Sequence, residues 1–150
     1  MNPIGFENIS RHITFSDEDL NRAFPGNPEG SLAERVADRI FSTILKNYPH
    51  LVIDLHNDWV QSIPYALIDP SDQEYTRQCT QDYATRTGLP TVLDTDLLSK
   101  SLSWSLLNRK IPAITLELGE SYVVNEKNVW YGIQAILNIL MHLDMVASLT

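Results

Sequence analysis

This 150-residue chain carries a carboxylate and an imidazole two positions apart, in Asp54 and His56. They fall at the end of a short, apolar, β-branched run over 51–55, and such runs are typical of a strand. Residues two apart in a strand project to the same face, so the carboxylate would lie beside the imidazole. A carboxylate in that place commonly orients a metal-bound histidine. The residues alone leave a plainer alternative open, in which Asp54 caps a turn and His56 is an ordinary strand-end residue.

Glu117 is an acid in the otherwise apolar run Thr115-Leu116-Glu117-Leu118-Gly119. Strand alternation would place the two leucines on one face and Thr115 with Glu117 on the other. A largely buried carboxyl group has a raised pKa, which suits proton transfer near neutral pH. The alternative is a glutamate that pairs with an arginine or caps the next helix. Further acids at expected strand ends are Asp69, Asp94, Asp96 and Glu120.

An amide and a guanidinium stand side by side in Asp19-Leu20-Asn21-Arg22, with Arg11 upstream. Arginine grips a carboxylate through two parallel hydrogen bonds, and asparagine adds a neutral donor. The pair would therefore recognise a carboxylate of a substrate. The alternative is a surface arginine beside a turn-forming asparagine.

Helix-like and strand-like patterns alternate along the chain after residue 30. Ser31 and Glu34 form a capping box that predicts a helix over 31–47. The apolar patterns then predict strands at 51–55, 65–68, 90–93 and 112–118 and helices at 71–87, 99–110 and 125–147. This alternation predicts an α/β fold with a mostly parallel, mixed sheet and helices on both faces. Residues 1–30 lack either period and are predicted to be a long ordered loop that binds substrate.

Composition restricts the function further. The formal net charge of -8 argues against binding of nucleic acid, which needs clustered Lys and Arg. The sequence has no basic amphipathic stretch for a membrane surface, yet a few local arginines suffice for a small anionic substrate. The single cysteine, Cys79, excludes an internal disulfide and a Cys-rich zinc cluster. Without an evident targeting signal, the chain is predicted to be a single cytoplasmic domain over 1–150.

A series of motifs resembles the succinylglutamate desuccinylase and aspartoacylase family, a branch of the zinc carboxypeptidase-like metallohydrolases. In order, they are Asn2-Pro3, Arg11, the run from Asp19 to Gly26, Gly30-Ser31, Asp54-Leu55-His56-Asn57 and Leu116-Glu117-Leu118-Gly119. The resemblance runs from Asn2 to the final helix. The order and spacing of the separate motifs make it specific.

The resemblance implies a zinc-dependent deacylase that cleaves an amide bond in a small, carboxylate-bearing N-acyl amino acid. It implies that His56 is a zinc ligand and that Asp54 contacts this ligand without binding the metal itself. Asn21 and Arg22 would bind the substrate carboxylate. Arg11 would bind substrate by polarising its scissile carbonyl, and Glu117 would be the general acid/base that activates water.

One departure from the family pattern affects the zinc site. The family takes its other two zinc ligands from a His-x-x-Glu motif upstream of the Arg11 position, and this sequence contains no such motif. Catalytic zinc normally has three protein ligands. We therefore expect a partial catalytic domain without the first strands, with little activity by itself, completed by a homo-oligomer or a complementing chain. The alternatives are a zinc carboxypeptidase acting on peptides and a non-catalytic carboxylate-binding module.

Overall fold

The computed structural model describes residues 3–95 and 99–147, so Asn2 and Asp96 lie outside the described residues. The elements are α1 (Pro3–Glu7), the 3-10 helix η1 (Leu20–Arg22), α2 (Leu32–Lys46), β1 (Val52–Asp58), β2 (Tyr65–Ile68), α3 (Glu74–Arg86), β3 (Thr91–Leu93), α4 (Leu102–Leu107), β4 (Ala113–Glu120) and α5 (Glu126–His142). None of the helices in the described ranges is long and apolar enough to cross a membrane.

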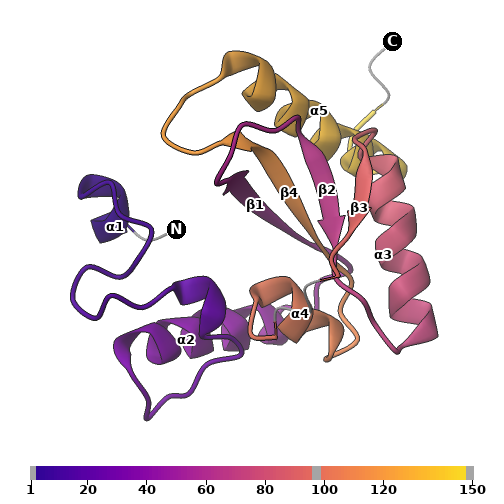
Figure 1. Cartoon of the computed structure of the whole chain (residues 1–150). Coiled ribbons are helices and arrows are strands. Elements are labelled where there is room, and N and C mark those ends of the chain that lie inside the picture. The colour runs from indigo at the N-terminus through magenta and orange to yellow at the C-terminus, as the bar shows by residue number, and fades with distance from the viewer. Residues whose placement is uncertain (1–2, 96–98, 148–150) are drawn as a thin grey trace.

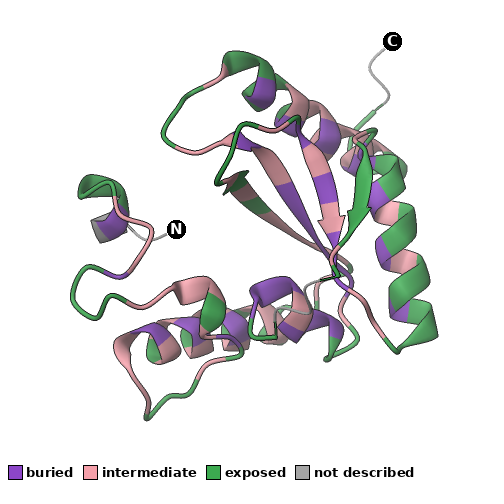
Figure 2. Cartoon of the chain, viewed as in Figure 1, coloured by how far each residue is buried: buried purple, intermediate pink, exposed green. Residues whose placement is uncertain are grey.

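The strands form one mixed sheet in the order β1-β4-β2-β3 (Figure 1). Strands β1 and β4 are parallel, as are β2 and β3, while β2 and β4 are antiparallel. The predicted α/β fold with a mostly parallel, mixed sheet is therefore confirmed. Among the described residues, β1 and β3 are the edges, and Figure 2 shows that β3 is exposed along its length.

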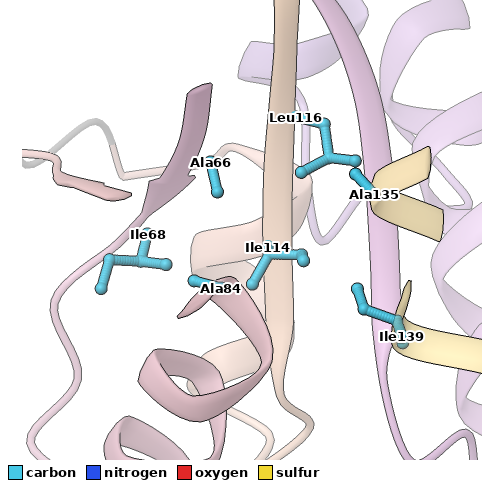
Figure 3. Packing of buried hydrophobic residues seen from close by; sticks show 7 residues of the cluster. All are labelled: Ala66, Ile68, Ala84, Ile114, Leu116, Ala135 and Ile139. Carbon is cyan, nitrogen blue, oxygen red and sulfur yellow. The ribbon is translucent and has the colours of Figure 1, made fainter. Parts of the chain in front are cut away.

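Helices cover both faces of the sheet. Ile114 and Leu116 of β4 point toward α3 and α5, where they pack with Ala84, Ala135 and Ile139 (Figure 3). On the opposite face Ala113 packs with Leu102 and Leu106 of α4, and α2 adds Ala37 and Phe41 to the same cluster. The residues of β4 that alternate with Ile114 and Leu116 are Thr115 and Glu117, so both belong to the face that α4 covers.

Helix α2 begins where the capping box predicts it. The Ser31 hydroxyl accepts the N–H of Glu34 at 3.2 Å, and the Glu34 carboxylate accepts the N–H of Ser31 at 2.8 Å. Helix α4 is shorter than the predicted span of 99–110, because Ser101 caps it at its start. Strand β1 is longer than predicted and extends through His56 to Asp58.

Residues 3–30 are ordered but are not one continuous loop. They contain α1, η1 and a short antiparallel bridge between Ile13 and Glu18. The segment is anchored by Ile13 and Phe24, both of which are buried. Phe24 packs in the cluster between α2 and α4. The segment that carries Asn21 therefore lies on the same side of the sheet as Glu117.

Candidate active site

Three polar side chains form a row across the sheet. His56 of β1 and Tyr65 of β2 are both in register with Glu117 of β4. Residues paired across neighbouring strands project to the same face, so the imidazole, the carboxylate and the phenol share the face that α4 covers. The row combines a potential metal ligand with a potential base.

Asp54 lies beside His56, as the two-residue spacing predicts. The His56 Nε2 atom is 3.0 Å from the Asp54 Oδ2 atom. When Nε2 carries the proton and donates to Asp54, Nδ1 keeps its lone pair, and Nδ1 faces Glu117 Oε1 at 3.8 Å. Burial lowers the pKa of His56, but the hydrogen bond and charge of Asp54 outweigh this effect, and the net pKa is raised.

Glu117 has the properties of a general base. Its side chain is 12% exposed, and Oε2 is buried without a hydrogen-bond partner in the described part of the chain. Burial raises the pKa of Glu117, although the nearby charges of His56 and Arg11 act against this. The sequence predicted this raised pKa. A carboxyl group in such a place can take a proton from water near neutral pH.

Asp19 holds Arg11, whose charge acts on both His56 and Glu117. The Asp19 Oδ2 atom accepts hydrogen bonds from Arg11 Nε at 3.0 Å and Nη2 at 2.8 Å, while Oδ1 accepts the N–H of Asn21 at 2.9 Å. The Arg11 guanidinium also lies over the ring of Trp59, 4.9 Å from its centroid, where a cation is attracted to the ring face. Burial raises the pKa of Asp19, but hydrogen bonds from Arg11 and Asn21 reverse this, and the net pKa is lowered.

Sequence reasoning assigned no role to Asp19 or Trp59. Asp19 opens the Asp-Leu-Asn-Arg run, and an acid before a short helical turn is a recognisable cap. That signal could have identified the bond from Asn21 N–H, but nothing in the sequence pairs Asp19 with a residue eight positions earlier. Trp59 follows β1 directly and is exposed, and an exposed tryptophan after a strand that carries site residues was the available signal.

Arg22 is less close to the row than expected. Its side chain is exposed, donates to the Asn21 carbonyl oxygen at 2.8 Å and lines a cavity of about 380 Å³ with Lys100. The structure thus brings together Asp54, His56, Glu117 and Arg11, and ties Asn21 to Arg11 through Asp19. Arg22 directly follows Asn21, but within the described residues no hydrogen bond or ion pair joins its side chain to the row.

The residues present supply only part of a zinc site. His56 fits as a ligand, because Asp54 holds one ring nitrogen and the other is directed toward Glu117. Within the described residues, however, no group of three His, Cys, Asp or Glu side chains could hold a metal ion. These residues therefore do not by themselves match the three-ligand set of a catalytic zinc.

Known proteins are similar to this chain in fold and in sequence. A succinylglutamate desuccinylase/aspartoacylase from Rhodobacter sphaeroides superposes with a TM-score of 0.83 at 26% identity, over 94% of this chain and 42% of that one. A product-bound ectoine utilization protein from Ruegeria pomeroyi superposes with a TM-score of 0.82 at 23% identity, over 94% of this chain and 44% of that one. These likenesses define the chain as a mixed α/β domain of the same fold.

The family model of the succinylglutamate desuccinylase/aspartoacylase catalytic domain matches residues 1–143. The chain therefore belongs to this family. It is also 38% identical over 61 residues to an N-alpha-acetyl-L-2,4-diaminobutyric acid deacetylase from Halomonas elongata, which covers 37% of this chain and 18% of that protein. The chain thus spans less than half the length of these relatives.

Proposed function

We propose that this chain carries the base and the substrate-binding arm of a deacylase that hydrolyses the amide bond of a small N-acyl amino acid. The observation that carries the proposal is the row of His56 and Glu117, with Arg11 held within electrostatic range of both. Membership of the family and the name of the Halomonas relative support the class of reaction.

The side chains have complementary roles in this proposal. Glu117 removes a proton from the attacking water and passes it to the leaving amine. Arg11 hydrogen-bonds the scissile carbonyl and stabilises the oxyanion that develops on it. Asn21 donates to the substrate carboxylate, and Arg22 turns from the Asn21 carbonyl to pair with the same carboxylate.

We also propose that His56 is one ligand of a zinc ion whose other ligands come from outside the described residues, from a further segment or a companion chain. A zinc ion there would act as a Lewis acid toward water and the carbonyl. Asp54 would keep the imidazole in the tautomer that presents Nδ1.

The test measures release of acetate from N-acetyl-L-2,4-diaminobutyric acid, in preparations completed so that they hold one zinc ion per chain. Glu117→Gln should lower kcat by about 100-fold to 10,000-fold, the usual range for loss of a general base. Glu120→Gln is the matched control, since Glu120 is a half-buried acid of the same strand. Equal rates for both variants, in a preparation whose unaltered chain hydrolyses the substrate, would refute the role of Glu117.

The same assay separates the alternatives. Release of a C-terminal residue from peptides in preference to the N-acyl amino acid would identify a carboxypeptidase. Binding of the N-acyl amino acid without turnover, in a sample loaded with zinc, would identify a carboxylate-binding module.

A further inference from the structure

The side-chain amide of Asn21 is oriented by a residue far away in sequence. Its Oδ1 atom accepts the backbone N–H of Leu102 at 2.9 Å, 81 positions along the chain. An N–H donor can face only the oxygen end of an amide, so this bond also decides where the nitrogen end lies. The described residues offer Nδ2 no hydrogen-bond partner, which leaves its two N–H groups for a ligand.

A second bond joins the same two segments. The N–H of Phe24 donates to the carbonyl oxygen of Lys100 at 3.2 Å. The segment that carries Asn21 is therefore attached at two points to residues 100–102, where α4 begins. Its position depends on the position of that turn.

The start of α4 is in turn attached to the sheet by buried polar groups. The Ser103 hydroxyl donates to Asp69 Oδ2 at 2.5 Å, and the Thr115 hydroxyl of β4 lies 3.5 Å from the Ser103 hydroxyl. Asp69 and Ser103 are 7% and 5% exposed. Asp69 directly follows β2, so this contact connects α4 to two strands. The catalytic roles proposed above leave Asp69 without a function.

We propose that the first turn of α4 is a positioning device for substrate recognition. The N–H of Leu102 fixes the Asn21 amide with its nitrogen toward the substrate carboxylate, and the contact between Ser103 and Asp69 holds this turn on the sheet. Leu102, Ser103 and Asp69 act through Asn21 and do not touch substrate. This inference rests on the proposed function, in which Asn21 binds a carboxylate.

The direct test removes one N–H group. Leu102 is the first residue of α4, a position where proline fits a helix. Ser101 before it has a ψ of 162°, which suits a residue preceding proline. Leu102→Pro therefore deletes the donor, whereas Leu102→Ala loses buried side-chain packing and keeps the donor.

The measurement is the Kd of the full chain for N-acetyl-L-2,4-diaminobutyric acid and for its uncharged primary amide. Leu102→Pro should raise the Kd for the acid about threefold to tenfold, the equivalent of one hydrogen bond. It should raise the Kd for the primary amide less than twofold. Leu102→Ala should bind the acid within about twofold of the unaltered chain. Equal weakening in the alanine and proline variants would overturn the inference.

A second pair of variants tests the contact between Ser103 and Asp69. Ser103→Ala should weaken binding of the acid, and Ser103→Thr should restore it. Ser105→Ala is the matched control, because Ser105 is also buried in α4 but its hydroxyl has no partner in the described residues. Adding Asn21→Ala to Ser103→Ala should cause no loss beyond that of Asn21→Ala alone, since both act through one amide. Additive losses would show that Ser103 has only a structural role.

The carboxylate role of Asn21 and the positioning role of α4 can be refuted separately. If Asn21→Ala does not change the preference for the acid over its amide, the carboxylate role in the proposed function is wrong. If Asn21→Ala abolishes the preference but Leu102→Pro retains it, only the positioning role is wrong. The NMR signals of the Asn21 side-chain amide, read without ligand, should move toward random-coil shifts in Leu102→Pro and not in Leu102→Ala.

Discussion

Replacement of Asp19 by asparagine should loosen both the Arg11 guanidinium and the fold around it. Asp19 receives two hydrogen bonds from Arg11 through one carboxylate oxygen and the N–H of Asn21 through the other. Asparagine keeps an oxygen for the N–H of Asn21 and remains a good cap. Asp19→Asn removes the charge, and its Nδ2 cannot accept the two hydrogen bonds that Arg11 donates to Oδ2. Asp19→Ala removes the cap as well.

The size of the effect follows from the burial of the pair. The Arg11 and Asp19 side chains are 29% and 19% exposed, so solvent screens their attraction only partly. Hydrogen bonds to charged groups contribute about 1.5–3 kcal/mol when buried, and we discount this to about 1.5 kcal/mol for Asp19→Asn. Asp19→Ala should cost about 1 kcal/mol more, the usual value of an N-cap.

Urea unfolding at several pH values checks this reasoning. The pKa of Asp19 is lowered in the folded chain, so its contribution is present above the unfolded pKa and is lost as the pH falls through the folded pKa. The unaltered chain should therefore exceed Asp19→Asn in stability at pH 7 and approach it in acid. Asp17→Asn is the control, since the Asp17 side chain is 93% exposed in its contact with His12. A gap that stays constant into acid, or equals that of Asp17→Asn, would refute the role of the charge.

Three further changes test other parts of the structure. Glu117→Gln should raise the free energy of unfolding at pH 7 by about 1 kcal/mol. Burial raises the pKa of Glu117, so the stability that its protonated form contributes is lost as the pH rises through that pKa. A gain that persists unchanged in acid would contradict this. Gly119→Ala should lower the free energy of unfolding by about 1–3 kcal/mol, because Gly119 has a φ of +89° and a Cβ atom would lie 2.1 Å from Asn128 Nδ2; an unchanged Tm would count against this strain. Ser31→Ala should cost about 1 kcal/mol through loss of the capping box, to be measured by thermal melting, and a loss below a few tenths would mean that Glu34 alone caps α2.

Local sequence signals predicted the parts of the fold that depend on neighbouring residues. The capping box of Ser31 and Glu34 predicted the start of α2, because both bonds join residues three apart. Strand parity predicted that Asp54 and His56 would share a face. An acid in an apolar strand predicted the buried carboxyl of Glu117 and its raised pKa, which follow from burial alone.

Contacts between distant segments could not be predicted in this way. The antiparallel direction of β2 against β4 is not encoded in its four apolar residues, which would read the same in a parallel strand. The bond between Leu102 and Asn21 depends on where α4 packs, and the donor is a backbone group that every residue except proline has. The pairing of Arg11 with Asp19 lies in a stretch without periodicity, where the path of the chain decides which charges meet.

The row of His56, Glu117 and Tyr65 also limits how this domain can change during evolution. A shift of β4 by one residue against its neighbours would exchange Glu117 with Leu116 and turn the carboxylate into the apolar layer under α3 and α5. A shift by two residues would keep each side chain on its own face, but would put Thr115 or Gly119 in the row in place of Glu117. Single-residue insertions or deletions within β4 should therefore be purged, because they destroy the core and the chemistry together, whereas insertions in the turn between β4 and α5 leave both in place.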